Sequence, residues 1–385
     1  ATPDTLNTFE DSLVTSIDGS PFRAVDQKRK SMGPIPQGFT ANQSDFVKKH
    51  HADMMVATWR RTSVNHSVGQ ARSVTGNDAW RGRTLQEAVA LQHGAGFALP
   101  NVHLMSGSGF TKRGIDDSLP SWCFGEQVAD PAFWPLSLDG QQGIVGAPSR
   151  SVLEKARALR DRLEQKSAFA RVYAKNRRLE HWQHLRGDSV KALEAEALID
   201  KLIVARDSTT LPLAKFGLKP SPDTERLLEV FPKVATDPLE AQAALAFLLL
   251  KHRVSVTVTL GPSFNVSLAE DVDIYGGGKG LPEGSIINPP IAFDFSHQEH
   301  RSIQAFMWSR MYSVMERLIG LLAAEEWAGG QSMWDRSMIY LASDFGRTKS
   351  RPSGSDSFGT GHDLDNGALI VSPLANGNHV LGGVD

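Results

Sequence analysis

Short runs of apolar residues, separated by turn-forming segments, predict the strands of this chain. Met54–Trp59 is almost entirely apolar, and Val254–Leu260 alternates apolar with polar β-branched positions. Met338–Ala342 and Ala368–Val371 are apolar runs of strand length near the end of the sequence, and a further short strand is expected at Asn101–Met105. Runs of this length, bounded by loops, are typical of strands buried in a sheet.

Apolar residues at helical spacing predict helices between these strands. Asp237 followed by Pro238 is a favourable helix start, and this helix should run to Lys251. Ser296–Trp327 is the longest predicted helix, and Gly329-Gly330 should end it. Other helices are expected at 84–92, from 151 onward, from about 188 to 204, and after Asn65 up to Thr75-Gly76. Helices that alternate with strands in this way predict an α/β fold.

The length of 385 residues is sufficient for one large α/β domain or two smaller ones. We expect a single domain over 1–385, with a helical insertion at 151–235 and a long loop excursion at 261–292. Because the sequence starts at Ala1 rather than Met, we expect a processed or truncated chain.

Charge and cysteine usage exclude some classes of protein. The formal net charge is −2, so no overall field favours nucleic acid or a membrane as a partner. The longest apolar runs, such as Ala243–Leu250, are far shorter than the roughly 20 residues of a membrane helix, so no transmembrane segment is expected. Cys123 is the single cysteine, which excludes an internal disulfide, and we expect it in the core.

One region departs from the balanced charge of the rest. Between Lys155 and Arg178 basic residues recur within the predicted helical insertion, while Val152, Leu159 and Leu163 repeat at helical spacing. A solvated helix face explains this pattern, and a surface for an anionic partner is the alternative.

Polar residues follow the strand predicted at Met338–Ala342. Asp344 and Arg347 come directly after it, and the next loop brings His362 just before Ala368–Val371. Ligands of open α/β sheets bind outside the carboxyl ends of the strands. A carboxylate and an imidazole there suit a divalent metal or acid–base chemistry. A salt bridge between Asp344 and Arg347, with His362 in a turn, is the alternative.

A second segment joins a histidine to a carboxylate. Ser296 and Glu299 fit a capping box, which puts His297 in the first turn of a helix, shortly after Asp294. The positive end of the helix dipole disfavours an imidazolium, and a neutral imidazole is the state that binds a metal. Helix capping beside a surface histidine explains the same residues.

A third segment, Asn65-His66-Ser67, lies between the strand Met54–Trp59 and a helix. A helix start after a strand is a suitable place for a nucleophile or an anion site. An N-cap with an incidental histidine explains it equally well. Gly276–Gly280 lacks the spacing of a phosphate loop, and no GxGxxG follows a strand, so a nucleotide site is not expected.

Six short motifs along the chain occur in the order found in a bacterial family. They resemble the motifs of domain-of-unknown-function family 1501, whose members typically read S-E-F-G-R-T, then G-R-D-H, near the end. The matching segments are Thr2–Phe9, Asn65–Gly76, Phe293–His297, Asp344–Thr348, Gly361–Asp363 and Val380–Asp385.

That family is similar to the alkaline-phosphatase-like superfamily, which includes sulfatases and metal-dependent phosphoglycerate mutases. The resemblance implies an α/β three-layer sandwich, with a mostly parallel sheet and helices on both faces. It also implies one or two divalent metal ions, such as Zn, Ca or Mn, held by aspartates and histidines at strand ends.

Taken residue by residue, the resemblance implies the members of the site. The implied metal ligands are Asp4, Asp294, His297, Asp344 and His362. His66 or Ser67 would act as nucleophile or acid–base group, and Arg347 would neutralise the charge of the substrate.

Phe345 stands where the superfamily has a histidine ligand, so two functions stay open. One is metal-dependent hydrolysis of a phosphate or sulfate ester, with a small anionic ester or a glycan as substrate. The other is a catalytically degenerate scaffold or binding protein that meets a protein partner in an extracytoplasmic assembly and holds no metal. The resemblance implies a periplasmic or extracellular location in either case.

Overall fold

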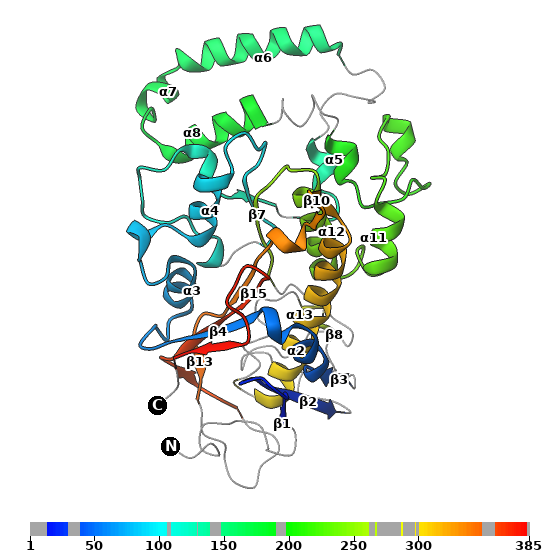
Figure 1. Ribbon diagram of the computed structural model, residues 1–385. Helices are drawn as coiled ribbons and strands as arrows, with labels where there is room; N and C mark the ends of the chain where they lie inside the picture. Colours follow the sequence, from blue (N-terminus) through cyan, green and yellow to red (C-terminus); the bar gives the residue numbers. More distant parts are fainter. Residues whose placement is uncertain are drawn as a thin grey trace. The chain divides into compact units, whose positions relative to one another are not determined.

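The computed structural model describes residues 14–29, 39–105, 109–128, 130–138, 148–189, 198–261, 266–267, 286–287, 297, 300–348 and 359–382. The chain divides into two compact units, and Figure 1 labels the main helices and strands of both. Unit 1 comprises Ala1–Thr84, Gly107–Gly114 and Gly261–Asp385. Unit 2 comprises Leu85–Ser106 and Ile115–Leu260. The excursion expected at 261–292 lies largely outside the described residues.

The largest sheet of unit 1 has four strands in the order β12-β15-β4-β16. Its strands are β4 (Met54–Trp59), β12 (Ile339–Ala342), β15 (Asn366–Val371) and β16 (His379–Leu381). β15 is antiparallel to both β12 and β4, whereas β16 is parallel to β4. Since β4 and β12 both run against β15, they point the same way, and their carboxyl ends lie at the same edge of the sheet.

A second sheet of unit 1 is a three-stranded antiparallel one packed near two helices. It contains β1 (Val14–Ser16), β2 (Arg23–Arg29) and β3 (Phe39–Asn42), and the helices are α2 (Ser44–His50) and α13 (His300–Ala323). The buried side of α13 includes Met307, Met311, Val314, Leu318 and Leu322, which recur at helical spacing. The aromatic rings of Phe46 in α2 and Tyr312 in α13 stack at 4.6 Å.

The remaining elements of unit 1 are short. They are η2 (His51–Asp53), α3 (His66–Thr75), η3 (Trp80–Gly82), η4 (Gly109–Thr111), β8 (Val266–Ser267), β9 (Ile286–Ile287), β10 (Glu326–Ala328), β11 (Gln331–Ser332), η9 (Trp334–Arg336), β13 (Gly346–Arg347) and β14 (His362–Asp363). The long helix was predicted to end at Trp327, but α13 ends at Ala323. The next residues form β10, and Gly329-Gly330 forms the turn between β10 and β11.

Unit 2 contains a three-stranded parallel sheet in the order β6-β5-β7. Its strands are β5 (Asn101–His103), β6 (Glu126–Gln127) and β7 (Thr257–Thr259). The core helix is α12 (Pro238–Lys251), whose residues from Leu239 to Leu249 are all buried. Asp237 caps this helix by accepting a hydrogen bond from the Leu239 amide, and Pro238 occupies the first turn, which confirms the predicted start.

Unit 2 contains further helices, most of them short. They are α4 (Leu85–His93), η5 (Ser121–Cys123), α5 (Trp134–Leu138), α6 (Arg150–Gln165), α7 (Ala168–Val172), α8 (Arg177–His184), η6 (Leu185–Ser189), α10 (Leu198–Leu202), η7 (Leu213–Phe216) and α11 (Thr224–Val230). Cys123 is fully buried in a cluster with Ala90, Leu119 and Phe124, which confirms its predicted place in the core.

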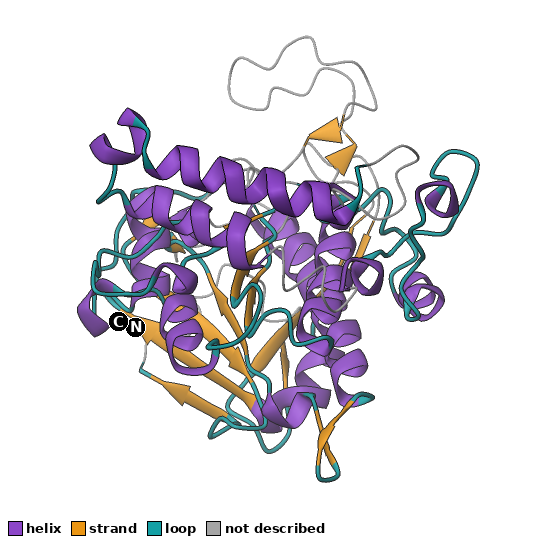
Figure 2. Ribbon diagram, turned by 90° about the horizontal axis from the view of Figure 1, so that it is seen from above, coloured by secondary structure: helices purple, strands orange, loops and turns teal. Residues whose placement is uncertain are grey.

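The predicted three-layer sandwich with a mostly parallel sheet is wrong. The sheets formed by the described residues have two to four strands and are mostly antiparallel or mixed, and Figure 2 distinguishes their short strands from the helices by colour. The apolar runs at 338–342 and 368–371 are strands as predicted, but they pair directly and antiparallel. The alternation of helices and strands suggested parallel crossovers throughout. Only β5, β6 and β7 form a parallel sheet in the described residues, and α13 leads instead into the antiparallel β10–β11 hairpin.

No helix in the described part of the chain is long and apolar enough to cross a membrane, in agreement with the sequence.

Candidate functional site

His66 occupies the first position of α3, at the end of the loop that follows β4. The Asn65 side chain accepts a hydrogen bond from the Val68 amide at 3.2 Å, and this N-cap fixes where the helix starts. Gly76, with φ 59°, forms the left-handed C-cap after Thr75. The strand, the histidine at the helix start and the helix end therefore agree with the prediction.

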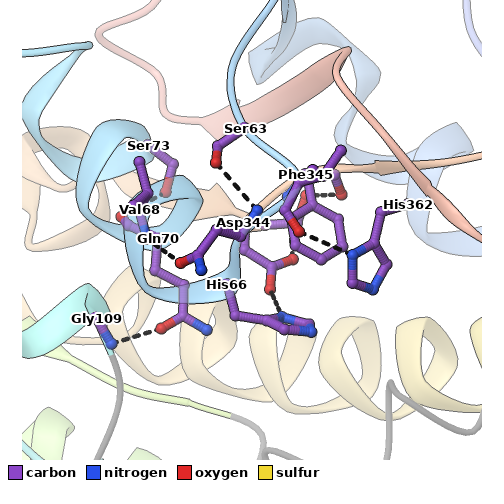
Figure 3. Close-up of polar contacts among 12 residues, drawn as sticks. Ser63, His66, Val68, Gln70, Ser73, Gly109, Asp344, Phe345 and His362 are labelled. Atoms are coloured by element: carbon purple, nitrogen blue, oxygen red, sulfur yellow. Dashed lines mark hydrogen bonds and ion pairs between the residues drawn. The ribbon is translucent and has the colours of Figure 1, made fainter.

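Asp344 follows β12 and pairs with His66, as Figure 3 shows. The Nδ1 atom of His66 lies 2.5 Å from Oδ2 of Asp344, and Oδ1 of the same carboxylate accepts the backbone amide of Phe345 at 3.0 Å. Both oxygens of Asp344 are thus engaged by protein donors. This carboxylate orients an imidazole, whereas the sequence predicted it as a metal ligand.

The close approach of two backbones brings this pair together. A β-carbon at Gly69 of α3 would stand 2.2 Å from the carbonyl oxygen of Asp344, so only glycine permits this contact. The Tyr340 hydroxyl of β12 donates to the Ser73 carbonyl of α3 at 2.7 Å, and burial raises the pKa of this phenol. These contacts hold α3 against β12 and fix the distance between the two side chains.

His362 enters the site from the short antiparallel pair β13–β14, in which it lies opposite Arg347. Its Nδ1 atom is 2.9 Å from the Val64 carbonyl oxygen. Because a carbonyl only accepts, Nδ1 carries the proton and Nε2 carries the lone pair. That Nε2 atom lies 3.0 Å from Nε2 of His297, and the Arg347 guanidinium lies 3.1 Å from the same atom of His297.

Phe345 forms the apolar floor between the histidines. Its side chain is buried, and its ring centroid lies 4.6 Å from that of His66 and 4.0 Å from that of His362. The Arg347 guanidinium lies 5.8 Å from the Phe345 ring, within the range of a cation–π contact. Phe345 therefore packs against the imidazoles of the site.

Most of the predicted site residues that the structure describes converge. His66, His297, Asp344, Arg347 and His362 form one cluster within unit 1, which we call the histidine cluster. Ser67 does not join it, because its side chain is exposed and its hydroxyl makes no hydrogen bond to the described residues. Asp4 and Asp294 lie outside the described residues.

The donor atoms available to a metal ion lie on His297 and His362. Zn–N bonds of about 2.0–2.1 Å place two ligand nitrogens of one ion roughly 3 Å apart or slightly more, which fits the 3.0 Å between these nitrogens. The hydrogen bond from His362 Nδ1 to a backbone carbonyl is the usual support of a metal-binding histidine. Within the described residues, however, no group of three or more His, Cys, Asp or Glu side chains is arranged to hold a metal ion.

Two buried contacts that the sequence did not reveal position the cluster. Nδ1 of His300 lies 2.9 Å from the Thr360 hydroxyl, two residues before His362. The Ser343 and Asn366 side chains join the end of β12 to the start of β15, with the Asn366 amide donating to the Ser343 carbonyl at 2.8 Å. The only sequence signal was the presence of His300 one helical turn after His297.

Comparisons with protein-family models, with curated proteins and with solved structures found no match. The resemblance to family 1501 therefore stays a prediction, and the histidine cluster must be interpreted from its own geometry.

Proposed function

We propose that the histidine cluster hydrolyses a small anionic ester, a phosphate or a sulfate ester. The proposal is carried by one observation, the 2.5 Å contact between His66 Nδ1 and Asp344 Oδ2. A carboxylate that accepts the Nδ1 proton keeps the lone pair of the imidazole on Nε2, which is the arrangement of a general base. Asp344 also stabilises the imidazolium that forms when His66 takes a proton.

Arg347 supplies the positive charge that an anionic ester requires. Arg347 lies in β13, which pairs with the strand that carries His362. Its guanidinium lies 3.1 Å from Nε2 of His297. A fixed cation beside a general base binds the ester oxygens and offsets the charge that develops on them during attack by water. His66 takes a proton from the attacking water and returns it to the leaving alcohol oxygen as the ester P–O or S–O bond breaks. Asp344 orients His66, and Arg347 holds the anion.

Of the ions that the resemblance implies, Zn or Mn would be held by His297 and His362, because Ca requires oxygen ligands. The ion would supply Lewis-acid polarisation of an ester oxygen. The steps assigned to His66, Asp344 and Arg347 require no atom of this ion. A periplasmic or extracellular location, as the family resemblance implies, is compatible with this chemistry.

The test measures hydrolysis of p-nitrophenyl phosphate and p-nitrophenyl sulfate by the full chain, with and without added Zn, Ca or Mn. We expect His66→Gln and Asp344→Asn to lower kcat by about 10²- to 10⁴-fold. Arg347→Gln should mainly raise KM. His379→Gln, in exposed β16 of the same unit, is the matched control and should retain full activity.

A second function, anion binding without turnover, is favoured by Phe345, whose apolar ring packs against two imidazoles of the site. In this case the chain would be a scaffold or binding protein. Calorimetry with inorganic phosphate and sulfate would then detect binding that Arg347→Gln abolishes, while neither ester is hydrolysed. Absence of both turnover and binding would refute the two functions together.

A further inference from the structure

Helix α6 of unit 2 presents a row of apolar side chains to solvent. Val152, Leu159 and Leu163 are 52%, 46% and 60% exposed, and Ala156 between them is also exposed. At about 100° per residue these four positions fall within roughly 60° of one another around the helix. We call them the apolar row. An amphipathic helix usually buries such a row against its own domain, so its exposure here requires another explanation.

The side of α6 that faces the rest of unit 2 is a polar one. Arg186, in the helical turn after α8, forms ion pairs with Asp161 and Glu164 of α6. These contacts lie roughly 100° or more around the helix from the apolar row. Polar contacts hold the helix in place, and the apolar row is not part of them.

Exposed apolar side chains continue beyond α6. Phe169 is 55% exposed, Val172 73% and Tyr173 47%, and the rings of Phe169 and Tyr173 lie 4.8 Å apart at α7. Aromatic side chains with one apolar and one polar end are enriched where proteins meet the surface of a membrane.

The charge of this segment is strongly positive. Residues 150–178 contain ten Lys or Arg and three Asp or Glu, although the whole chain has a net charge of −2. Lys155, Arg162 and Lys166 lie along one border of the apolar row, and Arg160 lies along the other. Long basic side chains beside an apolar row can extend to anionic groups while the row itself is buried.

We propose that α6 and α7 form a peripheral docking surface for an anionic phospholipid membrane. The apolar row and the exposed residues of α7 would enter the boundary between head groups and acyl chains, and the flanking lysines and arginines would bind lipid phosphates. This surface is independent of the histidine cluster and of the proposed hydrolysis.

Two other occupants of this surface are disfavoured, a second copy of α6 and an acidic partner helix. Packing two copies of α6 along the row would bring Lys155, Arg160 and Arg162 of one copy against the same cations of the other, which is repulsive. An acidic partner helix would satisfy the cations of α6. It would follow one helix axis, whereas the exposed apolar residues extend over both α6 and α7.

Co-sedimentation of the full chain with vesicles tests this proposal. The vesicles are phosphatidylcholine alone, or phosphatidylcholine with phosphatidylserine. We expect at least about tenfold stronger binding to the anionic vesicles, which high salt abolishes. Leu159→Ser with Leu163→Ser should lose this binding, and so should Lys155→Glu with Arg162→Glu. All four side chains are outside the core, so folding should be unaffected.

Two matched variants serve as controls. Lys215→Glu with Lys219→Glu reverses two exposed cations elsewhere in unit 2, and Ile115→Ser removes an apolar side chain that is 74% exposed. Both should bind vesicles as the unchanged chain does. Equal binding to both kinds of vesicle would overturn the proposal, as would equal losses in the controls. It would also be overturned if no vesicle bound and the apolar row instead mediated self-association or binding of an acidic helical peptide.

Discussion

Replacing Gly69 by alanine tests how α3 meets the end of β12. Alanine in place of glycine within a helix normally stabilises a protein by about 0.5–1 kcal/mol, because it restricts the unfolded chain. At position 69 the new β-carbon would lie 2.2 Å from the Asp344 carbonyl oxygen and 2.9 Å from its carbon. Non-bonded carbon and oxygen atoms stay about 3 Å or more apart, so the helix would have to move by roughly 1 Å.

The chain supplies a matched control for this substitution. Gly320 lies in α13, is exposed, and a β-carbon there would contact nothing within 4 Å. The gain from restricting the unfolded chain is common to Gly320→Ala and Gly69→Ala. The difference between them therefore isolates the cost of the clash, which we expect to be about 1–3 kcal/mol, as for other overpacked sites.

Chemical denaturation of both variants, followed by tryptophan fluorescence, measures this difference. Gly320→Ala should be as stable as the unchanged chain or slightly more stable, and Gly69→Ala should be clearly less stable. A shift of α3 would also lengthen the 2.5 Å contact between His66 and Asp344, so any hydrolysis should decrease in Gly69→Ala alone. Equal stability of the two alanine variants would refute the close packing of α3 on the Asp344 backbone.

Three further predictions follow from buried or paired groups. Burial lowers the pKa of His103 from 6.5 to about 4, so the folded chain keeps this imidazole neutral while the unfolded chain binds a proton. The free energy of unfolding is therefore unaffected by His103 above pH 6.5, and it falls by on the order of 3 kcal/mol as the pH decreases to about 4. Denaturation across this range should show a slope that His103→Gln reduces, and an unchanged slope would contradict the burial. For Glu316, burial acts to raise the pKa, but hydrogen bonds from Lys49 and His50 outweigh it and lower the pKa below its usual 4.5. Its contribution is therefore present above pH 4.5 and lost as the pH falls through the lowered pKa, and Glu316→Gln should flatten this acid limb of thermal unfolding. The Cys123 thiol is fully buried, so a thiol reagent should react only after unfolding, and rapid reaction of the folded chain would count against this core.

Elements with strong local signals could be predicted from the sequence. The starts of α3 and α12 are determined by an Asn or Asp cap and, in α12, by Pro238, so a few adjacent residues were sufficient. The strand Met54–Trp59 was predicted with the bounds that it has, since its apolar run ends where the loop begins. In contrast, only Thr257–Thr259 of the strand expected at 254–260 pairs in a sheet.

The arrangement of the strands could not be predicted in this way. Whether β12 pairs with β15 or with a parallel neighbour depends on contacts between distant segments, and the apolar pattern of each strand is compatible with either. The same limit applies to the site. His66, Asp344 and His362 were individually identified, but the pairing of Asp344 with His66 follows from the close approach at Gly69, which the sequence does not encode locally.

The position of β15 between β12 and β4 has a consequence for the order in which the chain matures. His66 and Asp344 are separated by 278 positions, and β15, which pairs with both of their supporting strands, is synthesised after both of them. A growing chain therefore exposes the edges of β4 and β12 until Asn366–Val371 emerges. Such distant pairings form slowly, because the entropy of a long loop must be lost before the paired strands gain any stabilising contact. The histidine cluster can thus form only after Asn366–Val371 has been synthesised, and this delays any reactive chemistry until the supporting sheet is in place.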